Sequence, residues 1–587
     1  MKKILNHKTK SNTKYKIMLG SKVLYQLKPQ LVKNLITKKW HVVGLFILCF
    51  AVLLSHLLYV SKTYQYPEMD EHLYMNIAVE YYRLLQHPSS DTIYKMNKFL
   101  IDNPPFRPPV YPLSITAFLL FLGLENSYKI ALAVNGLYYV LTIIGIYLLG
   151  REFLSRTASF FASLIFAFYG WSLFYLHFTY SETAATTIFV FGLLFLVRSR
   201  YFTNRKNSIL FGIFLSVGFM TRWLIPIFLA GPILLVLYKA WRNKLLNKKS
   251  SYINLLYVFA IFVPSIIFHY VDRSAFGTYI TSQMFYSSLW DLVPSYRKTH
   301  ISFQSAAYYF KVFEQLNIFF FLLFISGLVV SFLKRKWFFF ITFFTVYMIF
   351  SFGTVIKDDR YIVPIYPIIA LISATVLDHI KNIKTKVFIM VCVVLLGVGN
   401  LLGASWGLGP LGHEGLKSIL LPMPVGHPRR IHLTTIVWPP TRNFSNAHLI
   451  MQFLKEDSIK SDIKEPYILY LFSYHPLDNA LFSINRYQNL HMLNNYNFVG
   501  LIENGSEKSM QAFNLRYKRA DYVVLKKGGI ITDTYFQKYN YDLLQWINNN
   551  LYQEQFAFND NFKLIGTFSV PIDNSKILIY KRSLVSR

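Results

Sequence analysis

Acidic and basic side chains stand beside long apolar runs at several points of this sequence. Asp70 and Glu71 lie in "QYPEMDEHLYMNIAVEYYRLLQ", which directly follows an apolar run that ends at Val60. Carboxylates at membrane depth are costly and usually functional, so the pair is a candidate for chemistry. Later segments add further charges: Arg107 in "NPPFRPPVYP", Glu182 in "HFTYSET", Arg222 in "GFMTRWLIP", and Lys357, Asp358, Asp359 and Arg360 in "IKDDRYIVP".

These residue types indicate the kind of chemistry. Arginine is the preferred partner of phosphate, because its planar guanidinium group donates two parallel hydrogen bonds. A carboxylate that faces a phosphate-bearing lipid can take a proton from an acceptor hydroxyl, while arginines stabilise the departing phosphate. Adjacent helical residues point about 100° apart, so Asp70, which shares a face with Tyr74, and Glu71 cannot serve one hydroxyl. We expect Asp70 to be the base and Glu71 to support it.

The composition is that of a polytopic α-helical membrane protein. Of the 587 residues, 53% are hydrophobic and 15% are charged, whereas soluble proteins carry roughly 25% charged residues. A bilayer core needs about 20 apolar residues per helix, and the sequence supplies such runs repeatedly. The two cysteines, Cys49 and Cys392, lie inside apolar runs, so they imply neither a disulfide framework nor a zinc motif.

Eleven apolar runs are predicted membrane spans. Basic clusters follow the second, fourth, sixth, eighth and tenth spans, and residues 1–40 form a lysine-rich segment without an acid. The positive-inside rule then places the N-terminus in the cytoplasm and the C-terminus outside. The predicted spans are 41–60, 128–150, 156–177, 183–198, 207–221, 223–241, 252–271, 316–333, 337–354, 361–380 and 386–405.

One apolar stretch, "RPPVYPLSITAFLLFLG" at 107–123, does not fit this count. If it crossed the bilayer, every later basic cluster would move outside. Its prolines and short length fit a helix that dips into the outer leaflet. Residues 61–127 are then an external loop with two membrane-surface helices, and 272–315 form a further external loop. The membrane domain covers 41–405, and all the charges named above lie at its outer face.

The remaining residues, 406–587, are predicted to form an external α/β domain. The stretch 407–442 is rich in Pro and Gly and is typical of an irregular connector. After it come a helical pattern, "NAHLIMQFLKED", and strand-like "YILYLFS" and "ADYVVLK". The domain closes with the pair "FKLIGTFSV" and "KILIYKR" around a turn at Asp573 and Asn574.

At these motifs the sequence resembles the GT-C superfamily of membrane glycosyltransferases, in the branch of protein O-mannosyltransferases and lipid A aminoarabinose transferases. The resemblance is carried by "DEHLYMNIAVEYY", "NPPFRPPVYPLSITAFLLFLG" and "DDRYIVPIYPIIALISA", in this order, and covers the chain from about residue 41. It implies an inverting enzyme of the bacterial inner membrane. The implied donor is a sugar on a polyprenyl phosphate, and the implied acceptor is an extracytoplasmic glycan, lipid or protein.

The resemblance also implies roles for single residues. Asp70 matches the first-loop acid that acts as general base, Arg107 a basic residue before paired prolines, and Arg360 a late-loop arginine near the donor phosphate. We expect Arg222 and Lys357 to join the phosphate site, and Tyr74, Glu182 and Asp358 to support substrate or metal. Many relatives carry Asp where this sequence has Glu182. Some relatives use a divalent metal ion, and the sequence shows no ligand set that decides this.

Other interpretations stay open. Asp70 can cap its helix, Arg107 can snorkel to the interface, and Arg360 can form an ion pair with the adjacent aspartates. A ligase or polymerase that takes an oligosaccharide from a lipid diphosphate would need the same phosphate chemistry. A lipid or sugar transporter is disfavoured, because transporters show internal repeats and polar groups near the bilayer midplane.

Overall fold

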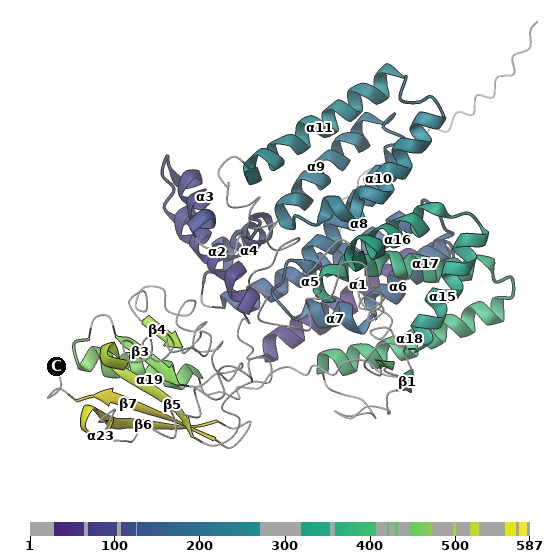
Figure 1. The fold of residues 1–587 in the computed structure, drawn as a ribbon. Coiled ribbons are helices and arrows are strands. Elements are labelled where there is room, and N and C mark those ends of the chain that lie inside the picture. The colour runs from purple at the N-terminus through teal and green to yellow at the C-terminus, as the bar shows by residue number, and fades with distance from the viewer. Residues whose placement is uncertain are drawn as a thin grey trace, which may run out of the picture.

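The computed structural model describes most of the membrane part and about a third of the C-terminal part (Figure 1). The described residues are 29–63, 69–102, 107–124, 126–270, 318–352, 359–406, 419–421, 429–431, 447–463, 466–471, 497–500, 517–527, 558–570 and 575–583. The predicted loop 272–315, the N-terminal residues 1–28 and the turn at Asp573 lie outside the described residues.

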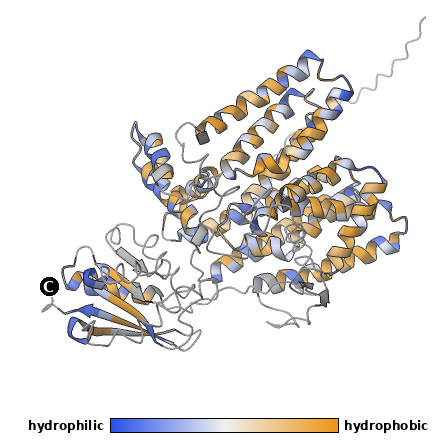
Figure 2. Cartoon of the chain, viewed as in Figure 1, coloured by the Kyte–Doolittle hydropathy of each residue, from blue (hydrophilic) through white to orange (hydrophobic). Residues whose placement is uncertain are grey.

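Helices dominate residues 29–406, as the apolar runs predict. Their bounds are α1 Pro29–Lys62, α2 Met69–Gln86, α3 Thr92–Asp102, α4 Val110–Leu122, α5 Ser127–Gly150, α6 Arg156–Ala167, α7 Gly170–Leu176, α8 Glu182–Arg198, α9 Arg205–Thr221, α10 Ile225–Arg242, α11 Lys249–Tyr270, α15 Ile318–Leu333, α16 Trp337–Phe352, η4 Asp359–Ile365, α17 Tyr366–His379 and α18 Ile383–Trp406. The expectation of a polytopic α-helical protein is confirmed. Figure 2 shows that apolar residues cover these helices along most of their length.

Six of the described helices are long and apolar enough to cross a bilayer alone, namely Trp40–Lys62 of α1, α5, α10, Lys249–Phe268 of α11, Arg360–His379 and Ile383–Gly403 of α18. A seventh span is formed if α6 and α7, which meet at a 59° bend, count as one. Every predicted span contains a helix, but α8, α9, α15 and α16 are shorter. The number of eleven crossings therefore stays a prediction.

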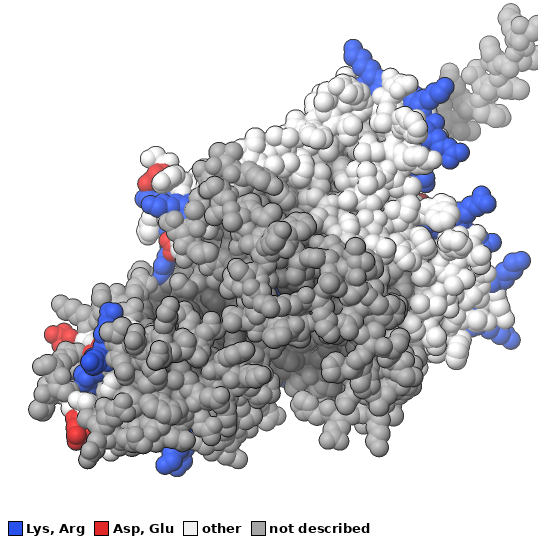
Figure 3. Space-filling view, viewed as in Figure 1, with Lys and Arg blue, Asp and Glu red and all other residues white. Residues whose placement is uncertain are grey.

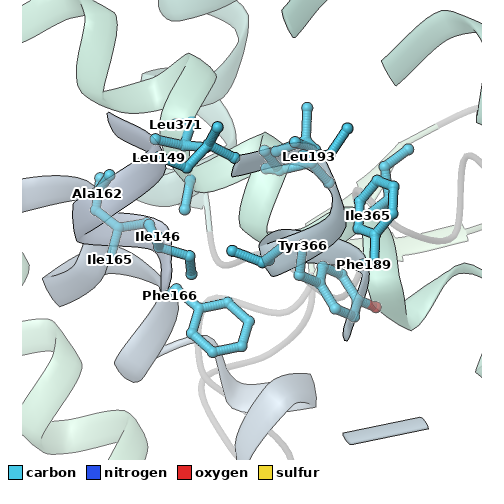
Figure 4. Close-up of a cluster of buried hydrophobic side chains, with 14 of the residues drawn as sticks. Ile146, Leu149, Ala162, Ile165, Phe166, Phe189, Leu193, Ile365, Tyr366 and Leu371 are labelled. Carbon is cyan, nitrogen blue, oxygen red and sulfur yellow. The ribbon is translucent and has the colours of Figure 1, made fainter. Parts of the chain in front are cut away.

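The core of the helical bundle is formed where α5, α6, α8 and α17 meet. Ile146, Ile165, Phe189 and Tyr366 come from these four helices and are almost completely buried. Figure 4 shows these side chains packed together with their neighbours. Small residues allow the close approach: a side chain on Gly327 of α15 would overlap the carbonyl group of Ile372 on α17. This close packing holds α5, α6, α8 and α17, and α15 beside α17, in fixed positions relative to one another.

The apolar stretch around Pro112 forms α4, which has 13 residues. At 1.5 Å per residue such a helix is about 20 Å long, shorter than the roughly 30 Å bilayer core. Helix α4 packs on α2, and the Thr116 hydroxyl donates to the Ala78 carbonyl at 2.9 Å. The first loop contains a third helix, α3, that the sequence analysis missed. Its apolar side, with Leu100, packs on α2 and on Phe268 at the end of α11.

The C-terminal part is an α/β unit, as predicted. Its elements are β1 Ile419–Leu421, β2 Arg429–Ile431, α19 Ala447–Lys460, β3 Tyr467–Leu471, β4 Asn497–Gly500, β5 Tyr522–Lys527, α23 Phe558–Asn561, β6 Phe562–Val570 and β7 Ser575–Arg582. The larger sheet has the order β4-β3-β5-β7-β6. Strand β3 pairs in parallel with β4 and β5, whereas β7 pairs antiparallel with β5 and β6. The described residues of the predicted irregular connector form an antiparallel pair of short strands, β1 and β2.

Basic side chains gather at the turns at one end of the bundle (Figure 3). Helices α8 and α9 show how the two ends of the bundle differ. Helix α8 runs from Glu182 to the basic turn at Arg198, and α9 returns from Arg205 to Thr221. Seventeen helical residues span about 25 Å. The residues between α7 and α8 and between α9 and α10 therefore lie at the end opposite to the basic turns.

Candidate active site

The loop between α7 and α8, residues 177–181, is the centre of the candidate site. Asn135 on α5 donates a hydrogen bond to the Phe178 carbonyl, and Tyr111 on α4 donates to the Asn135 side chain at 2.9 Å. At the far end of the loop, the Tyr74 hydroxyl on α2 bonds to Ser181 Oγ at 2.9 Å. The loop is therefore held by the first-loop helices and by the bundle together.

A second set of contacts holds the bent segment that leads into this loop. His177 Nε2 bonds to Ser405 Oγ on α18 at 3.0 Å, and the His177 ring stacks on Tyr59 of α1 at 3.7 Å. Asn400 on α18 donates to the carbonyl of Phe168, at the bend between α6 and α7. The carbonyl freed by the bend thus has a partner. The two histidines in this region, His56 and His177, pack in the protein interior.

Glu182 and Arg222 form a buried ion pair. Nη1 of Arg222 lies 2.5 Å from Oε1 of Glu182, and the side chains are only 9% and 4% exposed. Burial opposes the charge on Arg222, but the Glu182 carboxylate raises the pKa of the guanidinium group above its ordinary value. The second carboxylate oxygen, Oε2, is buried and has no hydrogen-bond partner within the described part of the chain.

Each of three predicted arginines lies over the ring of a tyrosine. The guanidinium carbon is 5.8 Å from the ring centre for Arg107 over Tyr74, 5.5 Å for Arg222 over Tyr361, and 5.0 Å for Arg360 over Tyr180. Such cation–π contacts orient a guanidinium group without consuming its hydrogen-bond donors.

These pairs are linked to one another. Tyr180 and Glu182 flank Ser181, which is bonded to Tyr74, and Tyr361 follows Arg360 directly. The loop therefore connects three arginines that are 115 and 138 residues apart in sequence.

The electrostatics of Tyr74 reflect this arrangement. Burial raises the pKa of the Tyr74 hydroxyl. Arg107 and Arg222 act in the opposite direction, and Glu182 adds to the rise. The Tyr74 hydroxyl is therefore close enough to Arg107, Glu182 and Arg222 for all three charges to act on its pKa.

Glu71 is completely buried and well supplied with donors. Its Oε1 accepts hydrogen bonds from the Thr179 amide at 2.5 Å, the Thr179 hydroxyl at 3.1 Å and the Tyr128 hydroxyl at 2.9 Å. It ties the first turn of α2 to the central loop. The neighbours on its helical face, Met75 and Ala78, are also buried. In this geometry Glu71 holds the central loop in place, and its role in the reaction stays a prediction.

For several predicted site residues, either the side chain or the whole residue lies outside the part of the chain that the structure describes. Asp70 lies in the first turn of α2, beside Glu71, but its side chain lies outside the described residues. Lys357 and Asp358 also lie outside them, and the side chain of Asp359 does too. Within the described residues, no group of three His, Cys, Asp or Glu side chains is placed to hold a metal ion.

The sequence analysis missed the residues that connect the charges. Thr179, Ser181, Tyr128, Tyr180 and Tyr361 all hold or flank a predicted site residue. A signal was available for three of them, because "HFTYSE" places two hydroxyls and a tyrosine directly before Glu182. Nothing in the local sequence distinguishes Tyr128 from the many other tyrosines.

Comparisons with known proteins agree with this fold. Residues 106–268 match the family model of dolichyl-phosphate-mannose-protein mannosyltransferases. Among solved structures, the chain is similar to ArnT from Cupriavidus metallidurans bound to undecaprenyl phosphate, with a TM-score of 0.54 and 12% identity, covering 92% of this chain and 99% of that one. The apo state of the same protein matches with a TM-score of 0.51 and 13% identity, covering 92% and 98%.

A sequence search among curated proteins finds no match. The segment that matches the family model contains Arg107, Glu182 and Arg222, and the structural similarity extends over almost the whole of both chains. Residues 106–268 thus resemble that mannosyltransferase family in sequence, and the chain as a whole shares the fold of the membrane protein ArnT.

Proposed function

We propose that the protein transfers a sugar from a polyprenyl-phosphate donor to an acceptor at the outer face of the membrane, with inversion at the anomeric carbon. The observation that carries the proposal is the convergence of Arg107, Arg222 and Arg360 on the loop around Ser181. Arginines oriented on tyrosine rings at one end of a helical bundle are suited to a lipid-borne phosphate.

In the proposed reaction, an acceptor hydroxyl attacks the anomeric carbon as the bond from that carbon to the phosphate oxygen breaks. Asp70 takes the hydroxyl proton, which prevents a positive charge from building up on the attacking oxygen as the new bond forms. The departing phosphate gains negative charge, which the arginines compensate. A single displacement of this kind inverts the anomeric configuration, and the transition state has oxocarbenium character.

The proposal includes a topology. Residues 1–40 are cytoplasmic, residues 41–405 form the catalytic membrane domain, and residues 406–587 lie outside, where they can meet the acceptor. The basic turns at the opposite end of the bundle support this orientation through the positive-inside rule. A bacterial inner membrane is the proposed location. ArnT, whose structure is similar, was solved with undecaprenyl phosphate, which makes this lipid a suitable probe.

The test is binding of undecaprenyl phosphate to the purified protein, measured by native mass spectrometry. We expect Arg360→Gln and Arg107→Gln each to weaken binding about 10- to 100-fold, since each removes a charge-assisted hydrogen-bond donor worth roughly 1.5–3 kcal/mol. Lys244→Gln, in the turn after α10, is the matched control and should bind like the wild type. Equal binding by all four proteins would contradict the phosphate site.

The alternative donor, an oligosaccharide on a lipid diphosphate, is tested by the mass of the lipid that co-purifies with the protein. A monophosphate with a single sugar supports the proposal. A diphosphate with a glycan would instead assign the protein as a ligase or polymerase.

A further inference from the structure

The Glu182 carboxylate has two oxygens in different situations. Oε1 is paired with Arg222, while Oε2 is buried without a hydrogen-bond partner among the residues that the structure describes. Glu182 is 3% exposed, and it opens α8 beside the loop that holds the three arginines. Side-chain oxygens in this situation are rare in native proteins and call for an explanation.

The energetic argument favours a bound ligand group. A buried acceptor without a donor has lost its hydrogen bonds to water and gained none in return, which destabilises the protein. The cost disappears when a ligand places an O–H or N–H group against the oxygen. A site that is incomplete without its ligand in this way discriminates strongly, because an analogue that lacks the donor leaves the cost in place.

The charge of the pair indicates which kind of group fits. Arg222 already compensates the negative charge of Glu182, at 2.5 Å from Oε1. A second full cation at Oε2 would lie close to the guanidinium group and be repelled by it. A neutral hydroxyl, or an amino group of a sugar, supplies a donor without that penalty.

The position of the pair indicates where that group comes from. The Arg222 guanidinium lies between Glu182 and the Tyr361 ring, and Arg360 precedes Tyr361. In the proposed function these arginines hold the donor phosphate. The anomeric carbon is bonded directly to a phosphate oxygen, so the substituents of the next ring carbon must lie close to the same arginines. Glu182, which is paired with Arg222, offers them a carboxylate oxygen at this place.

We infer that Oε2 of Glu182 accepts a hydrogen bond from a ring hydroxyl or amino group of the donor sugar, next to the anomeric carbon. This inference rests on the proposed function. Glu182 is then a specificity-determining residue that distinguishes the glycosylated lipid from the bare polyprenyl phosphate left after transfer. The same contact favours release of the spent lipid, because the spent lipid carries no sugar to fill the acceptor.

The test compares lipids retained by the purified full-length protein. Glycosylated and bare polyprenyl phosphates are extracted from the protein and from its membrane, and mass spectrometry gives the enrichment of the glycosylated form. Glu182→Gln keeps an oxygen for Arg222 and replaces Oε2 by an amide donor. We expect the wild type to enrich the glycosylated lipid at least tenfold over the membrane, and Glu182→Gln to lose that enrichment while retaining the bare lipid.

The matched control is Glu152→Gln, which removes the charge of a carboxylate paired with Arg198 at 2.8 Å at the opposite end of α8. It should keep the wild-type enrichment. If Glu182→Gln fails to fold, Glu182→Asp, which withdraws the carboxylate by one methylene, should reduce the enrichment in the same direction.

The outcomes separate the two proposals. Equal enrichment in wild type and both Glu182 variants overturns the inference, as does a wild type that retains bare and glycosylated lipid in the membrane ratio. In either case the proposed function stands. A wild type that retains no polyprenyl phosphate of either kind contradicts the proposed function itself.

Discussion

The Arg222 guanidinium group and the Glu182 carboxylate form an ion pair that is buried at the end of the helical bundle, with Nη1 2.5 Å from Oε1. Forty residues separate the partners in sequence, and they belong to different helical junctions, the start of α8 and the end of α9. The pair therefore joins two helical junctions. It also compensates the charge of the Glu182 carboxylate within the candidate site.

The first prediction concerns this pair. Arg222→Met should lower the free energy of unfolding by about 3–5 kcal/mol, because it leaves an uncompensated buried carboxylate. The double substitution Arg222→Met with Glu182→Met should recover a large part of that loss. Melting temperatures in detergent provide the measurement. Arg198→Met is the control: its pair with Glu152 is about one-third exposed, so the expected loss is about 0–1 kcal/mol.

The second prediction tests the proposed base. Asp70→Asn should lower the rate of sugar transfer by about 10²–10⁴-fold, since the acceptor hydroxyl loses its proton acceptor, and should leave the melting temperature unchanged. Transfer of a labelled sugar in membrane vesicles provides the rate. Glu80→Gln, on the same helix, is the control because Glu80 is paired with the nearby Arg83. Full activity of Asp70→Asn would end the assignment of the base.

The third prediction separates Glu71 from its neighbour. Glu71→Ala removes the acceptor for the Thr179 amide and the Tyr128 hydroxyl. Each buried donor left without a partner costs about 1–3 kcal/mol, so the melting temperature should fall clearly. Glu80→Ala should have a small effect. If Glu71→Ala were as stable as the wild type but inactive, Glu71 would act in catalysis and not as an anchor of the loop.

The fourth prediction concerns the packing that fixes the site. A Cβ atom at Gly327 would overlap the backbone of Ile372 and lie 2.9 Å from the Cα atom of Ser373. Gly327→Ala should therefore push α15 away from α17 and cost about 1–3 kcal/mol or more. Gly399 is also helical, but among the described residues no atom outside its own helix lies within 4 Å of a Cβ there. Gly399→Ala should be neutral or stabilising by up to about 1 kcal/mol. Similar melting temperatures for both variants would contradict this packing.

Much of the fold follows from local patterns. Each predicted span contains a helix, and the strands around Leu469, Val523 and Ile577 lie in the short apolar runs that the sequence analysis singled out. Hydrophobic periodicity reports burial within one element, so it identifies such elements well. It failed at α3, where Ile93 and Tyr94 are exposed and the apolar side is narrow, and at the bend between α6 and α7, where the apolar run continues without a break.

For the candidate site too, the sequence identified individual residues but not the contacts between them. Residue types and topology singled out Arg107, Glu182, Arg222 and Arg360. The contacts among them were beyond the sequence, because hydrogen bonds such as those of Glu71 with Thr179 and Tyr128 join segments 57 and 108 residues apart. A local pattern contains no information on which of many polar side chains will meet across helices.

The sequence by itself determined that the chain is a bundle of apolar helices with arginines and carboxylates at their ends, because burial in a bilayer requires long apolar runs and places charges at the boundaries. Only the tertiary structure decided that Arg222 is paired with Glu182 and that Glu71 accepts from Thr179. It also decided that one oxygen of Glu182 has no hydrogen-bond donor among the described residues. The reason is physical: hydrogen bonds form over about 3 Å, and the packing of distant helices decides which groups come that close.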